Sequence, residues 1–383
     1  MPCISLVQAQ DDLEPAKHVM SGFDETVDQI VQDVSHAMQV LNRVNLQVGP
    51  IAGPPNASTS SGFVLAIQRH LPEWMESLPG EDSVYLTASY AANVDPTSGR
   101  ACLAIDAALK DAGGQELHKL PRYLLVDEPS LLILLAGNGS LPLKGLGEFP
   151  LSDVRNDALV ELLARPKFAL QPRGNNWKVS TVARPSAGSP YGIEFLDRIR
   201  TDRNGNEYFW PVAVGQQNGQ PLVEIDEGHV FAVRLINDTP QPVAVTLTMN
   251  GRNILARDPR PGQKPATGLA GQNWIVAGKH STAMVWGQLA DGKKWLADGN
   301  KWTEFKSADG GADGSVLTAV FSAAFTDKPP ADEPPPAFTV NGEQFLQEGR
   351  KVEDRDRPLL MNFGVSRGAV SVRYREEREG GKP

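Results

Sequence analysis

The sequence predicts an α+β protein in which a small N-terminal α/β domain precedes an antiparallel, immunoglobulin-like β-sandwich and a C-terminal strand segment. Apolar residues recur at helical spacing in the first half of the chain, and strict alternation replaces that spacing in the second half. The 36 glycines and 30 prolines among 383 residues indicate many turns between short strands. A chain of this length can bury a large core in two folded units.

The N-terminal domain, predicted over residues 16–165, opens with a long helix. Ser21-Gly22-Phe23-Asp24 matches a capping box at the start of that helix. Its apolar residues are spaced three and four apart, which places them on a face toward a core: Phe23, Val27, Ile30, Val34, Met38 and Leu41.

Strands and two further helices complete this predicted domain. Alternating or apolar stretches predict strands at 46–51, 84–92, 101–109 and 123–126. Gly53-Pro54-Pro55 breaks the chain before a second helix that begins at 58–61, and another helix covers 152–164 before Pro166 ends it. Helices combined with a meander of strands are typical of a small α/β domain.

The sandwich domain, predicted over residues 166–326, is organised around residues 223–253. Phe231, Val233 and Leu235 alternate on one strand and Val243, Val245, Leu247 and Met249 on the next, which predicts two strands in one layer of the sandwich. Asn250-Gly251 supplies the positive φ values of a tight hairpin turn. Further strands are predicted at 168–170, 192–196, 274–276, 283–286 and 316–325, with hairpin turns at Asp291, Asp298, Asp309 and Asp313, each followed by glycine.

The proline-rich residues 327–337 are expected to form an extended, stiff linker to the C-terminal strand segment at 338–383. In that segment Val370, Val372 and Tyr374 lie on one face of a strand that needs a sheet. The strand pairs either with the protein's own sandwich edge or with that of a neighbouring chain, as in donor-strand complementation. These residues are therefore a candidate strand-exchange segment, and the second alternative predicts a homo-oligomer.

Charge and composition argue against several classes of protein. A net charge of −9 disfavours nucleic acid as a partner, because phosphate binding needs a basic face. No apolar run approaches the roughly 20 residues that span a bilayer, so no membrane span is predicted. The 2 cysteines, Cys3 and Cys102, cannot form a disulfide framework, and Cys102 is expected to be a small buried thiol.

Residues 1–15 are interpreted as a leader that contains the remnant of a signal peptide. Residues 3–7 are interpreted as the end of the apolar region of a signal peptide, Val7-Gln8-Ala9 has the small residues that signal peptidase prefers, and Asp11-Asp12 follows. We therefore expect an extracytoplasmic protein, periplasmic or secreted, whose mature form begins near Gln10. The alternative is an ordinary short cytosolic leader.

No catalytic fingerprint occurs in the sequence, so neither a cofactor nor an enzymatic activity is predicted. The 6 histidines lack metal-ligand spacing, although folding can bring some of them together. His229, which follows Asp226-Glu227-Gly228 at the start of a strand, is expected to lie at a rim. A convergent pair of carboxylates in a cleft would reverse this prediction and indicate a hydrolase.

Tryptophans cluster in the sandwich at Trp274, Trp286, Trp295 and Trp302. They are expected mainly in the core, and the alternative is an exposed platform that stacks on sugar rings. A row of solvent-facing tryptophans would indicate a glycan-binding module, whereas buried tryptophans together with bare apolar edges would indicate an assembly protein.

Two resemblances extend these expectations. The stretches VNLQVGPIAGPP, SVYLTASY and ACLAIDAALKDAGGQEL are similar to the α/β domains of CsgG-like and TolB-N-like periplasmic proteins, which implies that fold but not pore formation. EGHVFAVRLIND, AGKHSTAMVWG and GAVSVRY resemble uncharacterised exported proteins of planctomycete-type bacteria, which implies export and no activity. The expected function is a non-enzymatic structural or assembly protein, self-assembling or with a protein partner, in the cell envelope or an extracellular polymer. The alternative is a glycan- or peptide-binding module that uses the tryptophan-rich sandwich.

Overall fold

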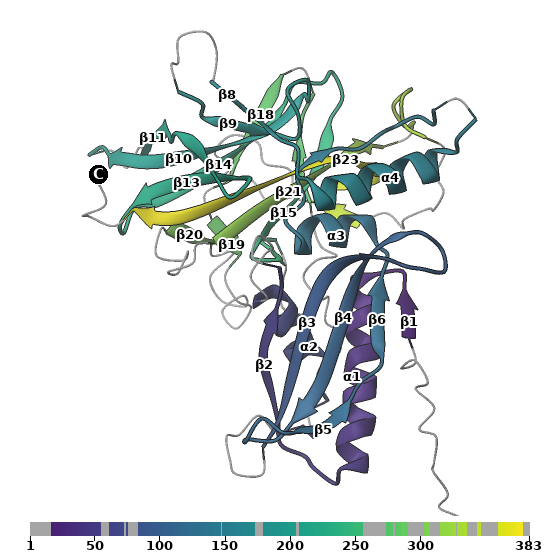
Figure 1. Ribbon diagram of the computed structural model, residues 1–383. Helices are drawn as coiled ribbons and strands as arrows, with labels where there is room; N and C mark the ends of the chain where they lie inside the picture. The colour runs from purple at the N-terminus through teal and green to yellow at the C-terminus, as the bar shows by residue number, and fades with distance from the viewer. Residues whose placement is uncertain are drawn as a thin grey trace, which may run out of the picture.

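The structure is a computed structural model, and it confirms a mixed α+β protein built mainly of strands (Figure 1). Within the described residues, the strands form three sheets, and no helix is long and apolar enough to cross a membrane. The described residues are 17–54, 61–72, 74–75, 83–146, 148–172, 179–203, 207–255, 273–278, 280–285, 287–289, 302–306, 315–326, 328–334, 343–345 and 359–377.

The N-terminal part is a sheet with two helices on one face (Figure 1). Its strands are β1 (Lys17–Met20), β2 (Leu46–Ala52), β3 (Val84–Val94), β4 (Ala101–Lys110), β5 (Glu116–Lys119) and β6 (Arg122–Leu125). They are ordered β1-β6-β4-β3-β2, and β5 pairs with β4. Helices α1 (Phe23–Val40) and α2 (Ser61–His70) bury their apolar residues against this sheet. The sequence prediction missed β1 and β5, because four residues are too few to show alternation.

The start of α1 differs from the predicted capping box. Gly22, in an extended conformation, is the capping residue, and no side chain caps the helix there. The Glu25 carboxylate reaches back instead and accepts hydrogen bonds from the Ser21 N–H at 3.0 Å and the Ser21 Oγ at 2.7 Å. The third helical residue is therefore Glu25, and its carboxylate bonds to Ser21, one residue before the capping position, so the arrangement is not the predicted box of Ser21 and Asp24.

Two larger sheets pack face to face around a second core. Their strands are β7 (Gly139–Ser140), β8 (Ala169–Gln171), β9 (Val182–Arg184), β10 (Tyr191–Thr201), β11 (Glu207–Pro211), β12 (Val214–Gln217), β13 (Gln220–Asp226), β14 (Val230–Asn237), β15 (Val243–Met249), β16 (Arg252–Asn253), β17 (Trp274–Val276), β18 (Ser281–Val285), β19 (Gly287–Leu289), β20 (Trp302–Lys306), β21 (Ser315–Phe325), β22 (Glu343–Phe345) and β23 (Leu359–Glu377). One sheet runs β19-β20-β14-β10-β9-β8, with β11 on β10 and β18 on β14. The other runs β12-β13-β23-β21-β15-β16, with β17 on β15 and both β7 and β22 on β23.

Strands β14 and β15 lie in opposite sheets, so the prediction that they share one layer is wrong. Their inward residues, such as Val233 and Val245, meet in one core between the sheets. Alternation identifies which face of a strand is buried, but it does not tell whether consecutive strands pair or face each other. The predicted turn at Asn250-Gly251 is confirmed: both residues have positive φ, 52° and 76°, and the turn joins β15 to β16.

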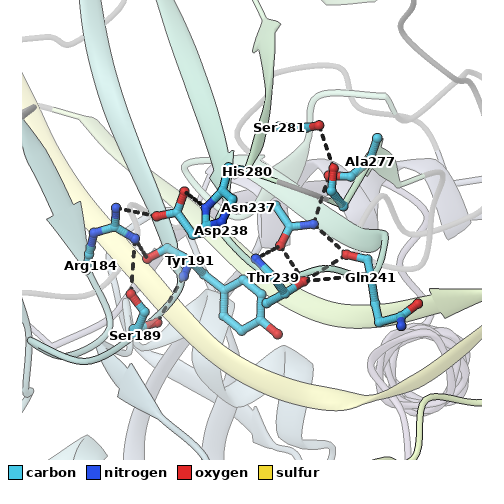
Figure 2. A network of polar contacts seen from close by, with 11 residues as sticks. Arg184, Ser189, Tyr191, Asn237, Asp238, Thr239, Gln241, Ala277, His280 and Ser281 are labelled. Carbon is cyan, nitrogen blue, oxygen red and sulfur yellow. Dashed lines mark hydrogen bonds and ion pairs between the residues drawn. The ribbon is translucent and has the colours of Figure 1, made fainter.

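The chain crosses from β14 to β15 at a corner that Asn237 holds (Figure 2). Asn237 is fully buried, and its Nδ2 donates to the carbonyl oxygens of Gln241 at 2.8 Å, Ala277 at 3.0 Å and Val276 at 3.2 Å. Its Oδ1 accepts from the N–H and the Oγ1 of Thr239. Because both polar atoms of the side chain are bonded, the corner has one well-defined geometry.

Strand β23 lies in the interior of its sheet, between β13 and β21. Val370, Val372 and Tyr374 are fully buried in the sandwich core. In this single chain, the predicted strand-exchange segment thus pairs within the protein's own sheet, and it occupies a central position rather than an edge.

The connection between α3 (Glu128–Leu134) and α4 (Leu151–Ala164) attaches the N-terminal part to β23. Strand β7 of this connection pairs with β23, and the Asn138 side chain accepts a hydrogen bond from the Ser371 N–H at 2.8 Å. Val320 of β21 and Ala369 of β23 belong to the same apolar cluster as α1 and α3. The two cores are therefore joined through β21 and β23, which α3 contacts, while α4 packs against β3 and β4.

Residues 328–334, within the predicted extended linker, fold back onto β23. The Glu333 N–H donates to the Pro330 carbonyl oxygen at 2.9 Å, which closes a turn. Arg367 donates to Asp332 at 2.7 Å and to Glu333 at 2.8 Å, and its hydrogen bond holds the pKa of Asp332 below the ordinary value. The prediction of an extended linker is wrong for these residues, because their carboxylates pair with an arginine of the strand.

Cys102 of β4 is fully buried, as expected, and burial raises its pKa to about 11. Because the thiolate is the reactive form, we expect a folded Cys3→Ser chain to resist a disulfide-exchange reagent such as DTNB at pH 8. The same chain unfolded in urea should release one equivalent of the coloured product within minutes. Equally fast reaction of the folded chain would contradict the burial of this thiol.

Candidate functional site

A cavity of about 670 Å³ opens at one end of the sandwich. It lies beside the turn that leads into β14, at the opposite end of that strand from the Asn237 corner. Both sheets contribute to its walls, which include the polar side chains of Asp197, Gln216, Gln217, Glu224, Asp226 and Arg375. The cavity therefore offers carboxylate, amide and guanidinium groups to a ligand.

The strand pattern explains how the acidic residues reach this cavity. Ile193 and Phe195 of β10 point into the sandwich core, so Asp197 continues the same face where the sandwich opens. Asp226 ends β13, and Gly228, with a φ of +74°, allows the chain to turn. The His229 N–H closes this turn by donating to the Asp226 carbonyl oxygen at 3.1 Å.

Asp197, Asp226 and His229 converge at the rim, and we call these three residues the rim triad. His229 Nδ1 lies 2.9 and 3.0 Å from the two carboxylate oxygens of Asp197 and 3.9 Å from Asp226 Oδ2. One potential ligand atom from each residue lies within 4.8 Å of the others. The side chain of Asp197 is 19% exposed and that of Asp226 is 63% exposed, so the triad is open on one side.

The cavity carries an excess of negative charge. Arg375 Nε donates to Glu224 at 2.9 Å, so this pair is neutral as a whole. Within the described part of the chain, Asp197 and Asp226 have no such guanidinium or ammonium partner and lie instead against His229. The open end of the sandwich thus favours ligands with hydrogen-bond donors or positive charge.

Two exposed aromatic residues lie on strand β11, which pairs with β10 at Asp197. Trp210 is 56% exposed and Tyr208 is 40% exposed. Trp210 is the cross-strand partner of Asp197, and such partners share a face of the sheet. The Arg200 guanidinium lies 4.3 Å above the ring of Tyr208 and holds it by a cation–π contact. The sequence interpretation missed both rings, although their alternate positions in EYFWP were a usable signal.

Of the four tryptophans predicted as a possible platform, the structure describes only the side chain of Trp274. Trp274 of β17 is 4% exposed and packs in the sandwich core, so it cannot stack on a ligand. Trp286 and Trp295 lie outside the described residues, and Trp302 belongs to β20 but its side chain is not described. The Asp-Gly turns predicted at Asp291, Asp298, Asp309 and Asp313 also lie outside the described residues.

A second polar cluster, at the joint between the two parts, is structural in character. Arg155 of α4 forms an ion pair with Glu128 and donates to the carbonyl oxygens of Pro142 at 2.6 Å and Ser366 at 2.8 Å. Burial raises the pKa of Glu128 above its ordinary value, although the neighbouring Arg155 opposes that shift. Since these bonds connect α3, α4 and β23, the cluster fixes their packing.

No protein-family model, curated protein or solved structure matches this chain. The resemblances to CsgG-like or TolB-N-like domains and to exported planctomycete-type proteins therefore stay expectations.

Proposed function

We propose that this chain is a non-enzymatic, extracytoplasmic binding protein whose immunoglobulin-like sandwich holds a segment of a glycan. The observation that supports this proposal best is the exposed Trp210 ring beside an acidic cavity on the same face of the sheet. Sugar rings stack on aromatic faces, and their hydroxyl groups bond to carboxylates and amides, which are the groups present here. The extracytoplasmic location rests on the signal-peptide-like residues 1–15 and on low cysteine content.

Trp210→Ala is expected to weaken glycan binding by about tenfold, or roughly 1.4 kcal/mol, because it removes the stacking surface. Affinity electrophoresis of the full chain through gels that contain soluble neutral or acidic polysaccharides measures this effect. Trp74→Ala is the matched control, because Trp74 is also exposed (41%) but follows α2 in the N-terminal part. Equal retardation of both variants, or no retardation of the parent by any polysaccharide, would contradict the proposal.

A hydrolase is a second candidate, because Asp197 and Asp226 form the convergent carboxylate pair that would indicate one. Two observations favour binding instead. Both oxygens of Asp197 face His229, and Asp226 is largely exposed, whereas a glycosidase holds one carboxyl group in a shielded position as the acid. An assay for reducing ends, with a polysaccharide that the protein binds, separates the two functions.

Assembly with itself or with a protein partner is the third candidate. It is supported by Val19 of the outermost strand β1, which is 54% exposed and pairs with Leu124 of β6. The burial of Trp274 also agrees with the criterion for an assembly protein. The intrachain pairing of β23 weakens this candidate, because the strand expected to exchange is already part of the protein's own core.

A further inference from the structure

We propose that the rim triad binds one divalent transition-metal ion of the Zn²⁺ type. This inference concerns Asp197, Asp226 and His229 themselves, and it does not depend on the glycan proposed above. The three residues supply one imidazole nitrogen and two carboxylate groups from separate parts of the chain. Asp197 comes from β10 of one sheet, and the other two residues come from the turn between β13 and β14.

The distances within the triad fit a tetrahedral ion. Zinc bonds to nitrogen and oxygen are about 2.0–2.1 Å long, so the ligand atoms around a tetrahedral ion lie roughly 3.4 Å apart. In the triad, His229 Nδ1 is 2.9 Å from Asp197 Oδ2 and 3.9 Å from Asp226 Oδ2. These two distances lie on either side of the required value, and the partly exposed side chains of Asp226 (63%) and His229 (41%) can rotate to reach it.

The choice of donors selects among metal ions. One imidazole nitrogen faces two carboxylates, and a single N–H cannot donate well to both of them, whereas a cation between them satisfies all three groups. Nitrogen with carboxylate oxygen suits Zn²⁺, while Ca²⁺ takes six to eight oxygen ligands and Mg²⁺ prefers octahedral oxygen. The imidazole nitrogen of His229 disfavours both of the latter ions, because they take oxygen ligands.

The cavity provides independent support for this site. Asp197 and Asp226 both line it, so the coordination position not filled by protein faces a space of about 670 Å³. Zinc sites with three protein ligands keep such a position for water or for a ligand. The charge is also suitable, because Glu224 of the same cavity is neutralised by Arg375 while the two aspartates of the triad lie against a histidine.

Isothermal titration of the full chain with ZnCl₂, after treatment with EDTA, tests the proposal. We expect one ion per chain with a micromolar dissociation constant, and at least tenfold weaker binding for His229→Ala and for Asp226→Asn. His280→Ala is the matched control, because this histidine is 78% exposed on the same sandwich but lies near one carboxylate, that of Asp238, at 3.5 Å. It should bind Zn²⁺ as the parent does, and Zn²⁺ should raise the melting temperature of the parent and this control but not of His229→Ala.

The other outcomes would contradict the metal site, the choice of metal or the glycan proposal. Failure of Zn²⁺ to bind in a saturable way below 100 micromolar (roughly −5 kcal/mol), or equal binding by His229→Ala, overturns the metal site. Binding of CaCl₂ that survives His229→Ala overturns the choice of metal. Zinc binding without retardation by any polysaccharide supports this site and contradicts the glycan proposal, and glycan binding without zinc binding does the reverse. Circular dichroism of each variant shows that the fold is intact.

Discussion

A chain that ends at residue 358, and so lacks β23, is expected to have no cooperative unfolding transition in either part. Val370, Val372 and Tyr374 are fully buried in the sandwich, and burial of each such side chain contributes about 1.5–3 kcal/mol. Their combined loss is comparable to the roughly 5–15 kcal/mol that stabilises a whole domain. Removal of β23 also leaves β13 and β21 with unpaired edges in the middle of their sheet.

The N-terminal part is expected to lose its structure with the sandwich, contrary to what the sequence alone suggests. Strand β7 pairs with β23, and the Ser371 N–H donates a hydrogen bond to the Asn138 side chain. Ala369 of the same strand belongs to the core that contains α1 and α3. A C-terminal truncation therefore removes part of both cores, whereas a tail joined by a free linker would leave the α/β domain intact.

Far-UV circular dichroism during thermal and urea unfolding measures this effect. The matched control is a chain that ends at Glu377, which keeps all of β23 and should unfold as the parent does. Light scattering shows the state of association of all three chains. If the chain ending at residue 358 is instead a soluble monomer with a normal transition, and the parent is an oligomer, then β23 exchanges between chains and its intrachain pairing is not the state in solution.

Local periodicity predicted the elements that depend on a single stretch of sequence. The spacing of Phe23, Val27 and Ile30 predicted α1, because a helix buries residues that recur every three or four positions. The alternation of Phe231, Val233 and Leu235 predicted which face of β14 is buried. It could not predict the sheet to which β14 belongs, since pairing depends on β10, β18 and β20, which lie far along the chain.

The candidate site was less accessible to prediction, because distant strands form it. The turn 226–229 indicated a rim position for His229, but no local pattern links it to Asp197 on β10. The burial of the tryptophans could not be predicted for the same reason. Trp274 lies on the inward face of its strand, whereas Trp210 is exposed on β11, which pairs only with β10 within the described residues. The pattern of a single strand does not tell a buried tryptophan from an exposed one.

Val233→Asp is expected to unfold the sandwich. Val233 is fully buried at the centre of β14, where its side chain lies between the two sheets in the second core. It pairs with Phe195 on one side and Val285 on the other, and both of these side chains are also buried. A carboxylate there loses its hydration without gaining a partner, which costs several kcal/mol, about the whole stability of a domain.

Ile199→Asp on the neighbouring strand β10 is the matched control for this change. It introduces the same charge at a β-branched residue of a strand, but Ile199 is 55% exposed, so its carboxylate stays hydrated and the free energy of unfolding should change by no more than about 0.5 kcal/mol. Urea unfolding followed by tryptophan fluorescence compares both variants with the parent. A Val233→Asp chain that keeps the parent's midpoint would place residue 233 on a solvated face, and the packing of β14 against β15 described above would then be wrong.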